Sequence, residues 1–337
     1  ALSRLSRDVP GYGASGSQDP SRGSLVRAKA DLIDLPEVAG VFDSAVAEPR
    51  LHTWEDWMLR SPQEMAEVEV ESIRSYADPC LQGRAAERGD GLEVLAARMV
   101  IAGLVVPTKR AKGVRGVRLM TVAKSRGRQR LVWDMRQANA RFRPPPAVKL
   151  GSIGALASLE LGEQGFFAAA ATDIPNFFYA LRMPAGFESY VVLEGVDLAY
   201  VRRLLRAQGH DCSDWPEGVD ALGCRCLPMG FSWAPLLAQA VLEHIVQEAG
   251  LAGESELRHG CGQVALRRWA TLCYLDDFTV LVKRASAAAA RQEAGALLNQ
   301  VKSALAAAGL GSHKDQAGEL LEVLGVIVDA SEGQVTL

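Results

Sequence analysis

The sequence predicts an α+β fold in which helices back an antiparallel sheet, and three observations support this class. First, residues 268–282 contain two segments rich in aromatic and β-branched residues, separated by a short turn, which is typical of a β-hairpin. Second, residues 166–171 form a further apolar run of strand length. Third, residues 236–246 carry apolar side chains at helical spacing, and the Ala-rich stretch 285–308 stops before Gly309, as helices commonly do.

Residues 1–85 are predicted to form a partly flexible N-terminal extension, to which we assign no chemistry. Residues 1–30 include a Gly- and Ser-containing stretch that is typical of a flexible tail or linker. Trp54 and Trp57 then precede an acidic helical pattern over residues 62–76, which is a candidate to pack on the part of the chain that follows.

A basic stretch dominates the next part of the chain. After a helical pattern that begins at Leu92, strands are expected as far as Asn139, and Pro144 begins a rigid turn. Residues 109–143 contain 12 Lys or Arg and one acid, a local charge of +11, although the whole chain has a net charge of −3. A basic strip in an acidic body is typical of a surface that binds a phosphate backbone with salt-dependent affinity. The alternative is a solvated basic hairpin.

Two adjacent carboxylates, Asp276 and Asp277, lie at the turn of the predicted hairpin. Carboxylates this close repel each other and lose hydration when they are partly buried, so a divalent cation would stabilise them. The alternative is an ordinary solvated Asp-Asp turn. A third acid, Asp173, follows the apolar run 166–171 and is expected at the end of a strand.

Several other segments favour the cation site over the solvated turn, because they occur together and in a fixed order. Residues 130–139 close the basic stretch, and Asp173 is followed five positions later by Phe178. Residues 227–235 have the sequence Leu-Pro-Met-Gly-Phe-Ser-Trp-Ala-Pro and precede a helical pattern, and Tyr274 begins the sequence Tyr-Leu-Asp-Asp. In this order the segments resemble the reverse transcriptase family, the retrotransposon polymerases in particular, and the resemblance covers the chain from about Leu92 to its end.

The resemblance matches each segment to a motif of the family. Asp173 with Phe178 is similar to the first palm motif, residues 227–235 to the Leu-Pro-x-Gly-aromatic-x-x-x-Pro motif, and residues 274–277 to the Tyr-x-Asp-Asp box. Further along the chain, residues 309–314 resemble the motif whose Lys lies near the incoming nucleotide.

The last match concerns residues 323–328, which resemble the primer-grip hairpin of the family. Leu324 and Gly325 are the candidate primer-grip residues in this segment.

The resemblance implies the fold of a polymerase right hand, an α+β palm whose antiparallel sheet is backed by helices, with a fingers subdomain. The implied fingers are residues 86–150 and 182–232, and the implied palm is residues 151–181 and 233–337. The thumb is expected to be missing, and the chain is expected to be a piece of a retroelement polyprotein whose thumb, RNase H and integrase regions lie elsewhere.

The resemblance also implies RNA-directed DNA polymerase activity, in which a primer on an RNA or DNA template is extended with dNTPs. Two Mg²⁺ ions, with Mn²⁺ as a substitute, would activate the attacking 3′-oxygen and stabilise the leaving pyrophosphate. Asp173 and Asp276 are the expected bridging ligands, and Asp277 supports one ion. Lys314 is the expected proton donor to pyrophosphate.

A nucleotide-binding set is implied as well. Phe178 would pack under the sugar and leave no room for a 2′-hydroxyl, which favours dNTPs; the alternative for this residue is ordinary core packing. Met229 stands where retroviral enzymes carry Gln. The whole set comprises Lys124 and Arg130 as the triphosphate clamp, Phe178 under the sugar, and Met229, Gly230 and Phe231 around the nascent base pair.

Other classes of site and location have less support from the sequence. The 6 cysteines form no CxxC pair and no secretory segment is visible, so free thiols in an intracellular, cytoplasmic or nuclear protein are expected. A zinc site made by His210, Cys212, Cys224 and Cys226 is the alternative, although its spacing is uncommon. No apolar run has the length of a membrane span.

Two other functions remain open at this level. An RNA-dependent RNA polymerase would share the palm and the paired acids, but such enzymes usually carry Gly-Asp-Asp and lack a bulky residue such as Phe178. A catalytically inactive retroelement remnant could instead serve as a nucleic-acid-binding module. The three carboxylates are all present, which argues against decay of the site.

Overall fold

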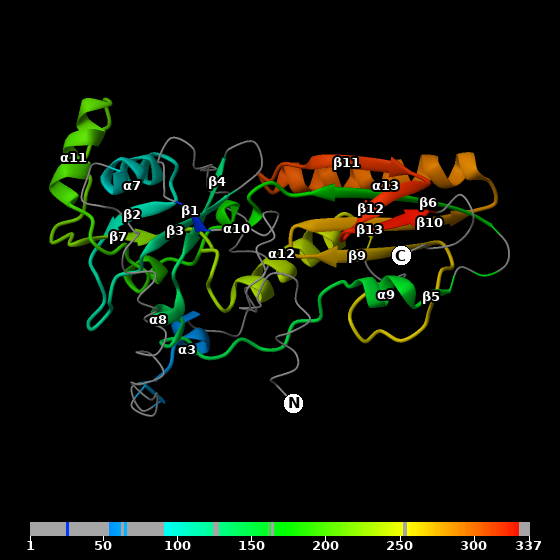
Figure 1. Ribbon diagram of the computed structural model, residues 1–337, viewed down its shortest axis with the longest axis horizontal. Helices are drawn as coiled ribbons and strands as arrows, with labels where there is room; N and C mark the ends of the chain where they lie inside the picture. Colours follow the sequence, from blue (N-terminus) through cyan, green and yellow to red (C-terminus); the bar gives the residue numbers. More distant parts are fainter. Residues whose placement is uncertain are drawn as a thin grey trace.

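The computed structural model describes residues 25–26, 54–61, 64–65, 91–123, 128–160, 162, 165–251 and 255–329. Two lobes lie side by side along the longest axis of the molecule (Figure 1). We call one the four-stranded lobe after its main sheet, and the other, which holds two smaller sheets, the small-sheet lobe. Helices α10 (Phe177–Ala180) and α12 (Ala234–Glu248) lie where the lobes meet.

The main sheet is antiparallel and has the strand order β11-β6-β10-β9. Its central strands, β6 (Phe166–Asp173) and β10 (Asp277–Arg284), pair along their whole length, with Asp173 opposite Asp277 at one end. The edge strands are β9 (Trp269–Tyr274) and β11 (His313–Gly318). Because β9 turns directly into β10, the tip of this hairpin lies beside the end of β6.

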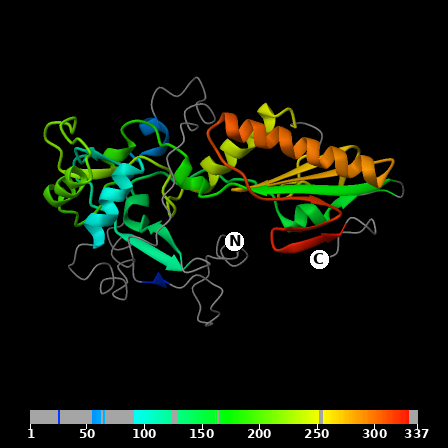
Figure 2. The same cartoon turned by 90° about the horizontal axis from the view of Figure 1, so that it is seen from above.

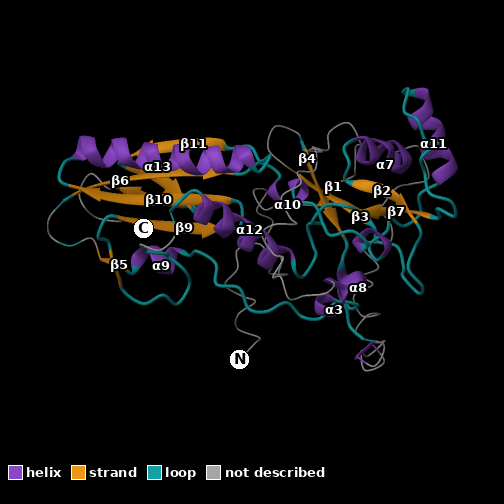
Figure 3. Ribbon diagram, turned by 180° about the vertical axis from the view of Figure 1, so that it is seen from behind, coloured by secondary structure: helices purple, strands orange, loops and turns teal. Residues whose placement is uncertain are grey.

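Helices cover one face of the main sheet. Ala168 and Ala170 of β6, together with Val280 of β10, belong to a large core that includes the inward sides of α12 and α13 (Ala287–Ala307). These side chains alternate along each strand, as the two-residue period of a strand requires. Burial of each Val or Leu in such a core contributes about 1.5–3 kcal/mol. Figure 3 shows α13 running along the sheet.

A smaller core covers part of the opposite face. Ala169 of β6 and Leu281 of β10 contact this second cluster, which also contains Leu156 and Val328. The elements that supply it are α9 (Ile153–Ala157), β12 (Leu320–Val323), β13 (Val326–Asp329) and the parallel pair β5 (Leu159–Glu160) and β8 (Val264–Ala265). Figure 2 shows the sheet nearly edge-on, with α13 on one side and α9 and the β12–β13 hairpin on the other.

The small-sheet lobe combines segments that are far apart in the sequence. In one sheet, β3 lies between β1 and β4, and in the other β2 pairs with β7. The strands are β1 (Leu25–Val26), β2 (Val105–Thr108), β3 (Leu119–Ala123), β4 (Gln129–Trp133) and β7 (Ala221–Cys224). The helices are α3 (Trp54–Met58), α7 (Gly91–Ile101), α8 (Arg136–Asn139), α11 (Leu198–Ala207) and the short 3-10 helix Phe187–Ser189.

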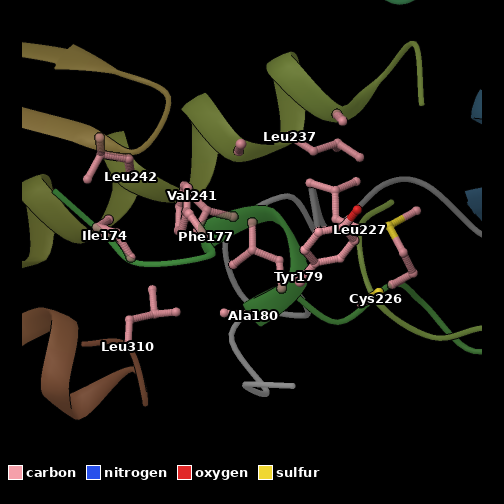
Figure 4. Close-up of a cluster of buried hydrophobic side chains, with 14 of the residues drawn as sticks. Ile174, Phe177, Tyr179, Ala180, Cys226, Leu227, Leu237, Val241, Leu242 and Leu310 are labelled. Atoms are coloured by element: carbon pink, nitrogen blue, oxygen red, sulfur yellow. The ribbon is translucent and has the colours of Figure 1, made fainter. Parts of the chain in front are cut away.

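The junction of the lobes is packed through α10. Phe177 and Tyr179 are buried in one cluster with Leu227 and Val241 (Figure 4). The Tyr179 hydroxyl donates a hydrogen bond of 2.5 Å to the carbonyl of Leu131 in β4, which ties the end of the main sheet to the small-sheet lobe.

Most of the elements predicted from sequence are present with shifted ends. The hairpin, the strand before Asp173 and the helices after Pro235 and Ala285 form as predicted. Strand structure was expected as far as Asn139, but β4 ends at Trp133 and α8 follows. At this point the N–H of Met135 donates to the carbonyl of Trp133, and Asp134 and Arg136 form a bidentate ion pair across the turn.

The N-terminal expectations are tested only in small part. Leu25 and Val26 were expected in a flexible tail, yet they pair with β3 as a short strand. Of the predicted helix over residues 62–76, the structure describes Glu64 and Met65 as helical, and the rest lies outside the described residues.

Candidate active site

The centre of the candidate site is a pair of carboxylates that face each other across two strands. Asp173 ends β6 and Asp277 begins β10, and the two are directly opposite in the antiparallel register. The backbone N–H of Ile174 donates to the carbonyl of Asp276 at 2.9 Å, which makes Asp173 and Asp277 a non-hydrogen-bonded pair. Side chains of such a pair approach closely, with Cα atoms typically about 4.5 Å apart, so two negative charges here repel strongly.

Asp276 occupies the turn of the β9–β10 hairpin and adds a third carboxylate. The residue before it, Leu275, has a φ of 53°, in the left-handed region that is unfavourable for Leu. The turn therefore depends on tertiary contacts that hold it in this conformation.

The carboxylates are partly buried, and their acid–base properties reflect this. Burial, followed by the negative charges of Asp276 and Asp173, raises the pKa of Asp277 from 3.8 to about 7. Burial also raises the pKa of Asp276, an effect that Asp173 increases and Arg130 and Lys314 reduce. The site therefore favours a positive charge close to these carboxylates.

Lys314 supplies one positive charge. Its ammonium donates a hydrogen bond of 2.7 Å to Asp173 Oδ2, and this bond raises the pKa of Lys314 above its ordinary value. His313, to which the sequence assigned no role, lies opposite Asp173 in the register with Nδ1 3.9 Å from Asp173 Oδ2.

Arg130 supplies a second positive charge from β4 in the small-sheet lobe. Its side chain is exposed, and its charge lowers the pKa of Asp276. Its role in a triphosphate clamp stays a prediction. Its predicted partner Lys124 lies outside the described residues.

Part of the positive charge of the basic stretch is paired with acids of the same chain. Arg136 pairs with Asp134 at 2.6 Å, Arg118 with Glu194 at 2.6 Å and Arg143 with Glu64 at 3.1 Å. Two of these three acids come from outside residues 109–143, so the positive charge available to a ligand is smaller than the local sequence charge of +11.

Phe178 differs from its two aromatic neighbours. Phe177 and Tyr179 are buried in the core, whereas Phe178 is half-buried and only its packed side touches that core. Both its predicted place under the sugar and the alternative of core packing therefore stay predictions.

The turn at residues 229–232 is held by its backbone. Gly230 has a φ of 111°, and a Cβ there would lie 2.4 Å from the carbonyl of Trp133, so only Gly fits. The side chain of Asn139 holds the turn with two hydrogen bonds of 3.0 Å. Its Nδ2 donates to the carbonyl of Gly230, and its Oδ1 accepts from the N–H of Ser232. Met229 is half-buried, and its carbonyl accepts from the N–H of Trp133 at 3.0 Å.

Phe231, which is predicted to lie around the nascent base pair, is a core residue. It is 2% exposed and packs against Phe142 and Phe187, with ring centroids 4.7 and 5.4 Å away. A direct contact between this side chain and a base pair would require the core to open. Its role at the site stays a prediction, which the backbone of the turn could fulfil.

Leu324 and Gly325 form the turn between β12 and β13, with φ angles of 51° and 80°. The predicted hairpin is therefore present, and its exposed face carries Leu320 and Ile327, which are 65% and 57% exposed. Its role as a primer grip stays a prediction.

Sequence analysis missed Gln239, which holds the hairpin turn from behind. This residue of α12 is 1% exposed; its amide donates to the Cys273 carbonyl at 3.0 Å and accepts from the Leu275 N–H at 2.9 Å. Glu243, one turn later, accepts from the same amide at 2.8 Å. A polar residue between Ala238 and Val241 on the apolar side of a predicted helix was the available signal.

The donor set fits a hard divalent cation such as Mg²⁺, because three carboxylates supply only oxygen ligands. Within the described part of the chain, no three His, Cys, Asp or Glu side chains converge closely enough to hold a metal ion alone. Mg²⁺ is commonly held by one or two carboxylates and completed by substrate phosphates and water. The same finding leaves the alternative zinc site without support, and Cys212, Cys224, Cys226, Cys261 and Cys273 are free thiols.

Comparisons with known proteins gave matches among solved structures only. No family model matches the chain, and no curated protein matches it. The chain is similar to a foamy viral protease-reverse transcriptase in complex with double-stranded DNA, with 18% identity and a TM-score of 0.47, over 71% of this chain and 33% of that one. The native prototype foamy virus enzyme gives 17% identity and a TM-score of 0.45, over 70% of this chain and 25% of that one.

The chain thus spans about a third or less of the length of these two viral proteins. Function is therefore inferred from the residues of the site. None of the described helices combines the length and the apolar character that a membrane span needs.

The pKa of Asp277 predicts a pH dependence of stability. Because its pKa is about 7 in the folded chain and 3.8 in the reference state, the folded state binds more protons between these values, and stability falls as pH rises from about 4 to about 7. Asp277→Asn should remove this loss and be more stable than the parent at pH 8 in EDTA by about 1–2 kcal/mol, a value reduced for partial solvent exposure. Urea unfolding at pH 5 and pH 8 measures it.

The Glu217→Gln variant serves as the control, since it removes one negative charge from an exposed side chain outside the candidate site. Parallel pH profiles for the parent and Asp277→Asn would contradict the assignment.

Gln239→Leu tests the support of the turn. The variant removes the amide and leaves the Cys273 carbonyl and the Leu275 N–H without that partner, at an expected cost of about 1–3 kcal/mol in the free energy of unfolding. Gln247→Leu, an exposed position on the same helix, should change it by less than about 0.5 kcal/mol. Equal effects of the two variants would show that Gln239 does not support the turn.

Proposed function

We propose that this chain is an RNA-directed DNA polymerase that extends a primer with dNTPs by nucleotidyl transfer. The observation that carries the proposal is the cross-strand pair of Asp173 and Asp277, with Asp276 in the adjoining turn and Lys314 bonded to Asp173. Carboxylates forced together in this way, with one pKa raised to about 7, suit the binding of cations rather than a structural role.

Asp173, Asp276 and Asp277 would hold two Mg²⁺ or Mn²⁺ ions. When bound, these ions supply activation of the attacking 3′-oxygen and neutralisation of charge on the leaving pyrophosphate. The protein side chains position the ligands, and burial strengthens their interaction with a cation because the local dielectric constant is lower than that of water.

Lys314 would act as the proton source for the leaving group. A general acid must carry its proton at neutral pH, and the hydrogen bond to Asp173 keeps the Lys314 ammonium protonated. Arg130 would bind phosphate oxygens of the incoming nucleotide, since its guanidinium is exposed and close enough to influence Asp276.

In this proposal the four-stranded lobe is the palm and the small-sheet lobe is the fingers, of the retrotransposon type. The template and primer would cross the face of the main sheet opposite α12 and α13. The two-residue period of the strands supports this choice, because Asp173 and Asp277 share that face with Ala169 and Leu281.

The proposal predicts single-nucleotide extension of a DNA primer on an RNA template, with enzyme in excess and Mg²⁺ present. dNTP should be added, and the Asp276→Asn/Asp277→Asn double variant should lose the addition because it lacks two of the three anionic ligands. Preference for rNTP would instead indicate an RNA-dependent RNA polymerase. Binding of the primer–template without extension, unchanged in the double variant, would indicate a nucleic-acid-binding module.

Phe178→Ala tests sugar selection. If Phe178 occupies the space next to C2′, its removal should raise the use of rNTP relative to dNTP by about 10- to 200-fold, the range expected for one group in a pocket. Phe166→Ala, at the other end of β6 and 52% exposed, should leave the ratio unchanged. An unchanged ratio in Phe178→Ala would remove this assignment.

A further inference from the structure

We propose that Asp315 is a positioning residue, which holds Lys314 against Asp173 by anchoring a bulge of β11 to Thr172 and Lys302. The inference rests on the proposed function for the role of Lys314, but its structural part stands on the described contacts alone. No role follows for Asp315 from the family motif, which ends at Lys314.

The first step concerns the register of β11 on β6. His313 lies opposite Asp173 and Gln316 lies opposite Ala171, so two residues, Lys314 and Asp315, share the place opposite Thr172. This two-against-one arrangement is a β-bulge, a device that redirects side chains beside functional sites.

The bulge decides which face of the sheet Lys314 can reach. In a regular ladder Lys314 would lie directly opposite Thr172 and share its face, on the side of α13, because opposite residues point the same way. With the bulge, Asp315 takes that place and bonds to Thr172, which leaves Lys314 free to reach Asp173. A shift of one residue thus exchanges the faces of a Lys and an Asp.

The second step concerns the contacts of Asp315. Its Oδ1 accepts a 2.7 Å hydrogen bond from the hydroxyl of Thr172, which is 3% exposed, and its Oδ2 accepts from the ammonium of Lys302 on α13. Although burial opposes ionisation of Asp315, the bonds from Lys302 and Thr172 lower its pKa, so the carboxylate is charged at neutral pH. The bulge is therefore fastened to both the sheet and the helix.

The third step concerns the conformation of Lys314. Its φ is 55°, in the left-handed region that costs a residue with a Cβ about 1–2 kcal/mol. A bulge of this kind usually places Gly there, so a Lys persists only when neighbouring contacts maintain the conformation. The bonds of Asp315, the next residue, are well placed to do so.

A matched ion pair on the same two elements provides the control. Arg291 of α13 pairs with Glu319, just after β11, at 2.9 Å, far along the helix from Lys302. Glu319→Ala removes a comparable link between the helix and the sheet edge without touching the bulge.

The test compares Asp315→Ala, Glu319→Ala, Lys314→Met and the double variant Lys314→Met/Asp315→Ala in single-turnover primer extension over a range of dNTP concentrations. Asp315→Ala should lower the rate constant at saturating dNTP by about 10- to 100-fold, no more than Lys314→Met does, with the half-saturating dNTP concentration unchanged. Glu319→Ala should stay within about twofold of the parent. The double variant should match Lys314→Met, because Asp315 acts through Lys314.

The proposal would be overturned if Asp315→Ala lowered the rate constant by the same factor in the parent and in Lys314→Met, or did not lower it at all. Amide hydrogen exchange of residues 311–318 supplies a readout without activity: exchange should be faster in Asp315→Ala and unchanged in Glu319→Ala. If the parent extends no primer, the proposed polymerase function fails, and exchange alone decides the anchoring role. Equal exchange in the two variants would then overturn it.

Discussion

The structure depends on the enforced proximity of two carboxylates across the centre of a sheet. Once β6 and β10 pair in their observed register, Asp173 and Asp277 must face each other, and no rotation of the strands can separate them. The register is in turn fixed by apolar side chains on both faces, since a slip of one residue would move Ala168 and Val280 out of the helix-covered core. The hydrophobic core thus holds a pair of like charges together, and a cation, a cationic side chain or a proton on Asp277 offsets their repulsion.

Most of the residues with strained backbone conformations belong to the segments that carry or contact these carboxylates. Among the described residues, the non-glycine positions with positive φ are Asn176, Leu275, Lys314 and Leu324. Asn176 lies three residues after Asp173, Leu275 directly precedes Asp276, and Lys314 is the proposed proton donor itself. Each conformation costs free energy that the surroundings must supply. Gln239 and Asp315 are the residues whose hydrogen bonds do this for the hairpin turn and for the bulge. The site is therefore held from behind by α12 and α13, the same helices that close the core.

Features that depend on interactions within one short segment could be predicted from the sequence, whereas features that depend on contacts between distant segments could not. Strand and helix periodicity lies within short segments, so the hairpin, the strand before Asp173 and the long helices could be recognised, together with the carboxylates at their ends. The bulge of β11 could not be predicted, because it exists only relative to β6, which precedes it by more than a hundred residues. The same holds for charge: the basic stretch could be counted, but not the acids Glu64 and Glu194 that neutralise part of it from other segments. Phe231 is a further case, since its motif position predicts a place around the nascent base pair, whereas its packing against Phe142 and Phe187 depends on segments far from it in the sequence.

The central claim is that Asp173 and Asp277 form a cation site that operates with bound nucleic acid and nucleotide. The most direct measurement is the number of Mn²⁺ ions bound per chain, by electron paramagnetic resonance, in a complex with RNA template, dideoxy-terminated DNA primer and the next dNTP. About two ions are predicted for the parent chain. For the Asp173→Asn/Asp277→Asn variant, fewer than about one bound Mn²⁺ ion per chain is predicted, with primer–template binding retained. The same ion count in both proteins, or no bound Mn²⁺ in the parent complex, would contradict the account.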